Sequence, residues 1–393
     1  MEAVGARSLV RRRGRPRRRW SIPALPTLRP AMLAGGARTA LPFPLDAAGA
    51  RFYYFARNAV WAAVKLLGLP GKEVLVPAYH HGVEIEALVD AGAVPRFYPL
   101  GVGLSLDPHV VVARMTRATA AVYVIHYLGF PQPLDEIVEA CRARGIPLIE
   151  DCALAGLSTD GERPLGSRGD VGIFCLYKTF PVPNGGVLVV NGTRPRGVPP
   201  PVPPPWTSTA SHVGSSLLEN LRLRGGPPGH WLADALRLAG RAVWSGAGAT
   251  RVPTGTQHFE RAHVQMGAAK VVHRILAAQD FARIVEVRRR NFFLLMGRLR
   301  DVAPPLVQEL APGVCPLFFP LVVARKSEVR RGLAARGIEA IDFWRTGHPA
   351  VRPGEFSDVD RLRETVIELP SHQDLSPAAM EFVAQSVREV LGA

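Results

Sequence analysis

The feature that most constrains the fold is a regular alternation of helix-like and strand-like segments that begins near residue 51. In ARNAVWAAVKLLGL and VEIEALVDAG, apolar residues recur at spacings of three and four, which predicts helices. Short apolar runs such as EVLVPAY and PLIEDCA predict strands between such helices. Alternating strands and helices predict an α/β fold, with a mostly parallel sheet and helices on both faces. In such sheets ligands bind at the carboxyl ends of the strands.

The pattern predicts four regions along the 393 residues. Residues 1–50 form a basic, Pro-rich N-terminal arm, and residues 51–255 form the large α/β domain. Residues 256–304 supply connecting helices, and residues 305–393 form a smaller C-terminal α/β domain. The proline-rich run 194–206 is predicted to be a surface loop, because proline is excluded from the interiors of helices and strands.

The net charge of +15 is concentrated at the N-terminus, where residues 1–20 hold eight arginines. The run 11–19 could lie in an AT-rich minor groove, so nucleic acid is a weakly suggested partner. A basic tail without function, or a start site placed too far upstream, explains the same residues. A secretory signal is disfavoured because prolines and Arg29 interrupt the apolar region that it needs. No apolar run reaches the roughly 18 residues of a membrane-spanning helix.

Four cysteines are present, and none forms a CxxC pair. Cys141, Cys152 and Cys175 stand in apolar helix-like or strand-like runs, which is typical of reduced core thiols. We therefore expect a cytoplasmic protein, and we predict no metal site.

One lysine raises the question of chemistry. Only five of the 48 basic Lys and Arg residues are lysines, and one of them, Lys178, follows the apolar run VGIFCLY. Arginine does not lose its proton in proteins, whereas a partly buried lysine can become an amine nucleophile. The alternative is that Lys178 merely marks the end of a strand at the surface.

Other polar residues follow predicted strands at the same edge of the sheet. His80 and His81 follow one strand, and Asp151 closes another. Arg57 and Asn58 open a helix whose free N–H groups suit a phosphate. An amine, an acid, a flat side chain and a phosphate site are what pyridoxal phosphate (PLP) requires.

Three separated stretches then carry a resemblance. FARNAVWAAVKLLGLPGKEVLVPAYHHGVEIEALVDAG, LIEDCALAG and KTFPVPNGGVLVVN resemble the DegT/DnrJ/EryC1/StrS aminotransferases, which are PLP enzymes of fold type I. The likeness continues through IHYLGFPQPLDEI, RRRNFFLLMGRL, CPLFFPLVV and IELPSHQDLSPAAMEFV, and it covers roughly residues 50–393. It implies a fold type I large domain, a smaller C-terminal domain and a homodimer.

The resemblance assigns the reactive centre to three residues. Lys178 would form the Schiff base with PLP, because a Gly-Gly pair follows it at the usual distance. Asp151 would bind the pyridine nitrogen, and His81 stands where an aromatic residue usually stacks on the ring.

The same resemblance assigns the remaining cofactor contacts. Arg57, Asn58 and Ala59 match the turn whose backbone binds the phosphate. Cys175 stands near the place of a serine that often contacts the phosphate, and Ala153 belongs to the cofactor-binding EDCA segment.

The chain departs from the family pattern at several positions. Leu154 replaces a His or Gln near the phenolic oxygen of the cofactor, and only Arg261 remains of an Asn-x-Arg element. His126 is expected to be structural rather than catalytic. His372 and Gln373 are expected to be structural as well.

The resemblance implies a PLP-dependent aminotransferase that acts on two small molecules. An amino acid donor, by analogy glutamate, would give its amino group to a keto-sugar or related carbonyl acceptor. Two alternatives stay open: another PLP reaction on the same fold, such as a sugar dehydration, and a catalytically silent homologue whose basic arm binds nucleic acid.

Overall fold

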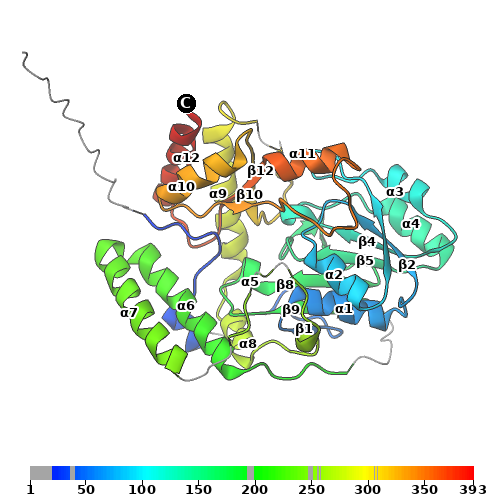
Figure 1. Ribbon diagram of the computed structural model, residues 1–393, viewed down its shortest axis with the longest axis horizontal. Helices are drawn as coiled ribbons and strands as arrows, with labels where there is room; N and C mark the ends of the chain where they lie inside the picture. Colours follow the sequence, from blue (N-terminus) through cyan, green and yellow to red (C-terminus); the bar gives the residue numbers. More distant parts are fainter. Residues whose placement is uncertain are drawn as a thin grey trace, which may run out of the picture.

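The computed structural model describes residues 20–35, 40–192, 199–246, 251–254, 256, 258–304, 306–307 and 309–393. Its helices surround two main sheets, one of seven strands and one of three (Figure 1). None of the helices in these ranges has the length and apolar character needed to cross a bilayer. The basic run 11–19 and part of the proline-rich run, residues 194–198, lie outside the described residues.

The seven-stranded sheet has the strand order β1-β9-β8-β5-β4-β2-β3. Its strands are β1 (Arg51–Tyr53), β2 (Glu73–Pro77), β3 (Val94–Tyr98), β4 (Thr119–Ile125), β5 (Leu148–Cys152), β8 (Val171–Cys175) and β9 (Gly186–Val190). Strands β3, β2, β4, β5 and β8 pair in parallel, whereas β9 is antiparallel to both β8 and β1. The predicted mostly parallel sheet is confirmed.

Helices cover both faces of this sheet. Ile173 and Leu188 pack on the face that carries α1, whereas Phe174 and Val187 on the same strands pack against α8. This alternation follows from the two-residue period of a strand, and it makes both faces apolar. The helices of this part are α1 (Ala56–Leu66), α2 (Val83–Asp90), α3 (Pro108–Arg114), α4 (Asp135–Arg144), α5 (Leu176–Thr179) and α8 (Lys270–Ala277).

The second sheet is antiparallel, with β12 between its two neighbours. It comprises β10 (Phe318–Val322), β11 (Ile341–Asp342) and β12 (Val366–Pro370). Ile367 and Leu369 of β12 pack into a core of their own, whereas Val366 packs against the core of the large sheet. The small sheet therefore turns one face toward the large sheet. Its helices are α9 (Phe281–Leu299), α10 (Lys326–Ala335), α11 (Ser357–Thr365) and α12 (Pro377–Leu391).

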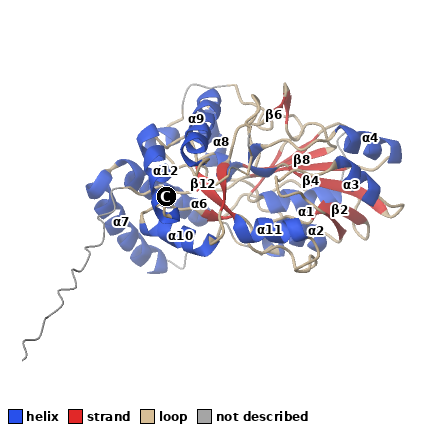
Figure 2. Ribbon diagram, turned by 90° about the horizontal axis from the view of Figure 1, so that it is seen from above, coloured by secondary structure: helices blue, strands red, loops and turns tan. Residues whose placement is uncertain are grey.

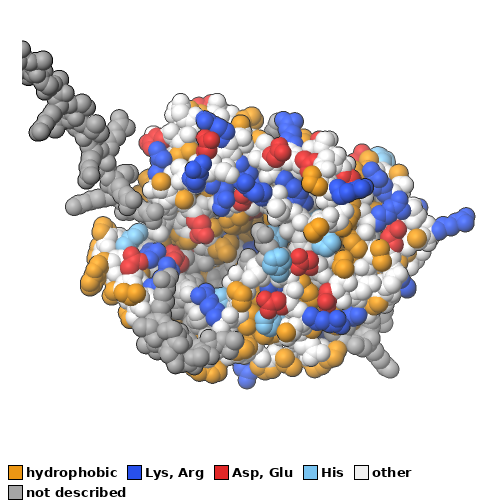
Figure 3. Space-filling model, in the orientation of Figure 1, with side chains coloured by type: hydrophobic (Ala, Val, Ile, Leu, Met, Phe, Trp, Pro, Cys, Tyr) orange, Lys and Arg blue, Asp and Glu red, His pale blue; other side chains and the backbone are white. Residues whose placement is uncertain are grey.

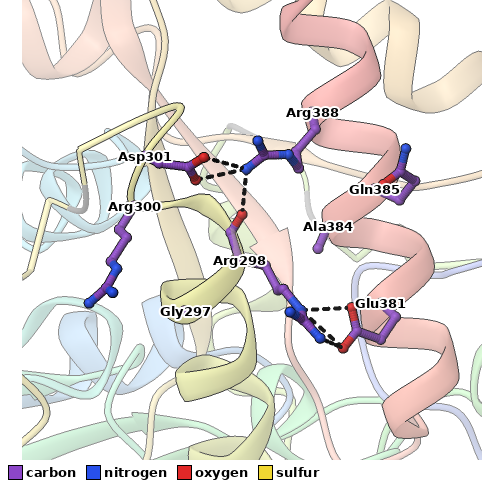
Figure 4. A pocket seen from close by; sticks show the side chains of 8 residues that line it. All are labelled: Gly297, Arg298, Arg300, Asp301, Glu381, Ala384, Gln385 and Arg388. Carbon is purple, nitrogen blue, oxygen red and sulfur yellow. Dashed lines mark hydrogen bonds and ion pairs between the residues drawn. The ribbon is translucent and has the colours of Figure 1, made fainter. Parts of the chain in front are cut away.

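Ion pairs join α9 and its following turn to α12. Figure 4 shows Arg298 paired with Glu381, and Arg388 paired with Asp301, along a cleft of about 500 Å³. Because these side chains are largely exposed, each pair contributes little to stability. None of the predicted site residues lines this cleft.

The remaining elements are peripheral to the two main sheets. Helices α6 (Trp206–Arg224) and α7 (Gly226–Gly246) form a hairpin at the end of the molecule opposite α3 and α4 (Figures 1 and 2). The short elements are η1 (Pro30–Leu33), η2 (Tyr127–Gly129), η3 (Arg261–His263), β6 (Thr159–Asp160) and β7 (Arg163–Pro164).

The described part of the predicted N-terminal arm is packed against the body. Ile22 donates its N–H to the Gly337 carbonyl at 2.8 Å and accepts from the Glu339 N–H at 2.9 Å. Thr27 donates from its backbone and its hydroxyl to Asp374 at 2.7 and 2.9 Å. Residues 20–27 therefore run along the three-stranded sheet and its neighbours, whereas Leu28, Met32 and Leu45 pack with α8 and one face of the large sheet. The predicted boundaries of the four regions stay a prediction.

Candidate active site

Parallel pairing brings the predicted polar residues to one edge of the large sheet. Strands β2, β5 and β8 run in the same direction, so their carboxyl ends meet at that edge. Asp151 lies opposite Ile125 of β4 and Ile173 of β8. The expectation that Lys178 directly ends a strand is wrong. Strand β8 ends at Cys175, and Lys178 lies in the short helix α5 that follows.

The ammonium group of Lys178 acts on three groups at this edge of the sheet. Burial raises the pKa of Asp151 and of Glu84, and the charge of Lys178 opposes that rise; burial and the same charge both lower the pKa of His81. Lys178 is partly buried, and its Nζ has no hydrogen bond or ion pair within the described residues. The amine is thus close to these groups and not engaged by them.

Asp151 is buried and firmly oriented. Its Oδ2 accepts a hydrogen bond from the Tyr123 hydroxyl at 2.5 Å, and its Oδ1 accepts from the Ala153 N–H at 2.8 Å. Burial raises the pKa of Asp151 to about 6, although the Tyr123 hydrogen bond and the Lys178 charge both lower it. Ala153 therefore contributes its backbone N–H. Sequence reasoning missed Tyr123, whose only signal is a hydroxyl-bearing ring inside an apolar strand.

Of the two adjacent histidines, His81 faces this cluster. Burial and the charges of Lys178 and Arg57 lower the pKa of His81 to about 4, so the ring is neutral at neutral pH. Its Nδ1 is buried and has no hydrogen-bond partner among the described residues, and the ring packs edge-on against Trp344 with centroids 6.2 Å apart. His80 is instead fully buried and stacks on Phe97.

The first turn of α1 adds positive charge to the site. The residue that caps α1, Phe55, makes no side-chain hydrogen bond to the free N–H groups. Arg57 is buried, and its guanidinium lies 3.7 Å from the Phe55 ring centroid. Asn58 donates from Nδ2 to the His263 carbonyl at 2.7 Å. Ala59 is fully buried in the core. An open helix N-terminus beside a buried arginine suits an anion.

The Gly-Gly pair after Lys178 lets β9 approach this turn closely. An added Cβ at Gly186 would lie 2.2 Å from the Phe55 carbonyl oxygen, so only glycine fits. Gly185 has φ +139° and donates to the Tyr54 carbonyl at 2.9 Å. The pair thus explains how Lys178 and the start of α1 come together.

Cys175 lies on β8, opposite Gly186. The thiol is buried. Burial raises the pKa of this thiol, so it is a protonated neighbour rather than a nucleophile.

A buried clamp holds the end of α5. Arg288 of α9 donates from Nη2 to the Thr179 carbonyl at 3.2 Å, and Gln373 donates to the same oxygen at 2.9 Å. Arg288 Nε also donates to Gln373 Oε1 at 2.9 Å. The residue after Lys178 is therefore fixed from two distant segments. Gln373 was expected to be structural, and the structure places that structural contact next to the lysine.

A cavity of about 1480 Å³ adjoins α5 on the side of the helical hairpin. Tyr177 and Phe180 line it together with residues of α6 and of the N-terminal segment. Figure 3 shows a depression between this hairpin and the rest of the molecule.

Comparison with known proteins finds a family similarity in the first half of the chain. The model of the DegT/DnrJ/EryC1/StrS aminotransferase family matches residues 56–194. GDP-perosamine synthase of Vibrio cholerae is 32% identical over 138 residues, which cover 34% of this chain and 37% of that protein. Residues 56–194, about a third of the chain, are thus similar to the DegT/DnrJ/EryC1/StrS aminotransferase family.

Two further comparisons fix the extent of the likeness. L-glutamine:2-deoxy-scyllo-inosose aminotransferase of Streptoalloteichus tenebrarius is 36% identical over 127 residues, 32% of this chain and 30% of that protein. The matches thus span about a third of these curated relatives. The PLP form of a putative sugar aminotransferase, Spr1654 from Streptococcus pneumoniae, is 14% identical, covers 95% of this chain and 99% of that chain, and has a TM-score of 0.66. This likeness confirms the fold type I architecture.

The predicted departures from the family pattern are visible in this structure. Leu154 is buried in the apolar core, so it offers no polar group to a ligand. Arg261 lies in η3 with a largely exposed side chain, 4.0 Å from Asp90. His126 and His372 are fully buried and hydrogen bonded, to Glu150 and to the Pro23 carbonyl, as expected of structural histidines.

Proposed function

We propose that this protein is a PLP-dependent aminotransferase that moves an amino group from an amino acid donor to a keto-sugar or related small carbonyl acceptor. Glutamate is the expected donor. The observation that carries the proposal is the unengaged Lys178 amine, whose charge acts on the buried Asp151 carboxyl at the same edge of the sheet. The two curated relatives, named for a perosamine synthase and an inosose aminotransferase, support this acceptor class.

The residues present fit the cofactor. Lys178 would hold its aldehyde end, and Asp151 its ring nitrogen. The open start of α1 and Arg57 would hold its phosphate. The orphaned Nδ1 of His81 would face the ring region, because Lys178 and Arg57 both act on that histidine. A buried polar atom without a partner calls for an explanation, and a ligand bound at this position would supply one.

The side chains then divide the work of the reaction. When bound, PLP supplies an aldehyde carbon that carries amino groups and a ring that accepts electrons. Asp151, oriented by Tyr123 and Ala153, would keep a proton on the ring nitrogen. Lys178 would move the proton at the donor Cα, for which a neutral amine is required. Because the His81 ring is neutral, it would place no positive charge beside Lys178. The amine would therefore accept the proton without repulsion from this ring.

A visible spectrum tests this proposal. The purified protein supplied with PLP should absorb at about 410–430 nm, as lysine-bound PLP does, and Lys178→Ala should abolish that band. Lys72→Ala is the matched control, because Lys72 is exposed and lies outside the site. Equal spectra for the wild type and Lys178→Ala would overturn the proposal.

One observation favours a second candidate reaction. The apolar Leu154 near the proposed site leaves room for a non-transaminating PLP reaction, such as sugar dehydration. Transfer of nitrogen from ¹⁵N-labelled glutamate to a panel of carbonyl acceptors separates the two reactions. Label in the acceptor supports the aminotransferase, and loss of water without label supports the dehydratase.

We also propose a cytoplasmic homodimer. All four cysteines are buried and unpaired, which supports a reducing compartment. Trp206, Trp231 and Leu238 of the helical hairpin are each more than 70% exposed, which supports a partner surface. Sedimentation equilibrium measures the mass in solution, and a monomer at micromolar concentration would contradict the dimer.

A further inference from the structure

Glu368 lies in the middle of β12, opposite Pro320 of β10 and Ile341 of β11. Its neighbours Ile367 and Leu369 point into the core of the small sheet. Because side chains alternate along a strand, Glu368 points to the other face, where Val366 packs against the core of the large sheet. The Glu368 carboxyl is therefore enclosed between the two sheets, and the residue is only 4% exposed.

This carboxyl has no hydrogen bond or ion pair within the described residues. Of the two lysines that act on it, Lys326 is already bound to Asp342 at 2.5 Å and to the carbonyls of Phe343 and Arg363. Lys178 is the other, and its Nζ is not engaged. The Glu368 carboxyl on the small sheet and the Lys178 amine beside the large sheet thus interact electrostatically.

The protonation state of the Glu368 carboxyl determines which chemical groups it can bind. Burial raises its pKa to about 8, against the lowering effects of Lys178 and Lys326. At neutral pH it is therefore mostly a carboxylic acid, with one O–H donor and remaining acceptor capacity. A neutral donor and acceptor pair matches a hydroxyl group. It does not match a carboxylate, which is best recognised by a cation.

We propose that Glu368 is a specificity-determining residue that hydrogen-bonds a hydroxyl group of the acceptor, so that polyhydroxylated carbonyl compounds are preferred. This inference rests on the proposed function and adds to it. A site that presents a polar group to a substrate hydroxyl discriminates strongly against compounds that lack the hydroxyl, because the buried group is then left without a partner.

Two ketones test the inference. scyllo-Inosose carries hydroxyl groups around its carbonyl ring, whereas cyclohexanone has the same ring and carbonyl without them. Calorimetric titration of the PLP-loaded protein should show tighter binding of scyllo-inosose. Glu368→Leu should weaken that binding about tenfold or more and leave cyclohexanone unaffected. Glu368→Gln, which keeps a donor and an acceptor, should stay within about threefold of the wild type.

The control variant is Glu364→Leu, because Glu364 is exposed on α11 of the same region. In turnover assays, Glu368→Leu should raise the KM for scyllo-inosose and leave the KM for glutamate unchanged. A merely structural role would change both constants. The inference is overturned if the wild type does not prefer scyllo-inosose, or if Glu368→Leu binds both ketones as the wild type does. An absent 410–430 nm band would instead defeat the proposed function, so the two failures are distinguishable.

Discussion

At the scale of single residues, the acid of the site is controlled by a tyrosine on the neighbouring strand. The Tyr123 hydroxyl donates to Asp151 and lowers a pKa that burial has raised to about 6. Tyr123→Phe removes this hydrogen bond, so the pKa of Asp151 should rise further. Because the proposed role requires the carboxylate, activity should begin to fall at a higher pH when the solution is acidified. The acidic limb of the kcat/KM profile should therefore move upward by about one pH unit.

Tyr98→Phe provides the matched control for this measurement. Tyr98 is equally buried, but its hydroxyl donates to the Tyr123 carbonyl and does not touch Asp151. Its acidic limb should therefore coincide with that of the wild type. An unchanged limb in Tyr123→Phe would show that the hydrogen bond does not control the acid.

The residues that sequence reasoning found and missed differ in how their positions arise. Lys178, Asp151 and His81 stand next to recognisable strand and turn signals, so their place at one edge of the sheet could be predicted. Tyr123 becomes a partner of Asp151 only through the register of β4 and β5. Arg288 contacts the residue after Lys178, and Glu368 comes under the electrostatic influence of Lys178, through packing of segments more than 100 residues away along the chain. Such contacts depend on tertiary structure, which no local pattern encodes.

At the scale of elements, helix α5 is too short to hold Lys178 in place by itself. Its last carbonyl is fixed by Arg288 and Gln373, and Arg288 also donates to the Pro316 and Leu317 carbonyls. Arg288→Met should leave the Pro316 and Leu317 carbonyls without this donor and the Thr179 carbonyl with Gln373 alone, and cost roughly 2–3 kcal/mol of unfolding free energy, measured by urea denaturation. It should also weaken the 410–430 nm band at limiting PLP, because the lysine is less well positioned.

Arg289→Met separates the two effects. Arg289 is adjacent on α9, but it donates to the Ala311 and Val314 carbonyls and does not contact α5. This variant should lose stability and keep full PLP binding. Equal PLP binding by Arg288→Met and the wild type would show that the clamp serves stability alone.

At the scale of the whole molecule, the large sheet was predictable and its junction with the small sheet was not. Periodicity indicates which segments are strands and helices, and it implies a mostly parallel order. It does not reveal that β9 turns antiparallel, or that residues 20–27 pack along the small sheet. It also gives no sign that Glu368 would be enclosed between two sheets, since the run VIELP is that of an ordinary strand.

Because Glu368 is enclosed between the two sheets, the stability of the whole protein should depend on pH. Glu368 ionises near 4.5 in the unfolded chain and at about 8 in the folded protein. The folded state therefore binds more protons between these values, so the contribution of Glu368 is most favourable below pH 4.5 and is lost as pH rises to 8. Lys178, Lys326, Asp342 and Tyr79 are the charged and titratable groups that act on Glu368 or respond to it. Glu368→Gln cannot ionise, so this loss should disappear.

The difference in unfolding free energy between Glu368→Gln and the wild type should therefore grow by roughly 3 kcal/mol between pH 5 and pH 7.5, at about 1.36 kcal/mol per pH unit. Urea denaturation of the PLP-free protein at several pH values measures it, independently of catalysis. Glu364→Gln should show a constant difference, because that side chain is solvated in both states. Parallel curves for Glu368→Gln and the wild type would mean that the folded protein ionises Glu368 normally. The carboxyl would then be charged at neutral pH, and the argument that it pairs with a neutral hydroxyl would lose its basis.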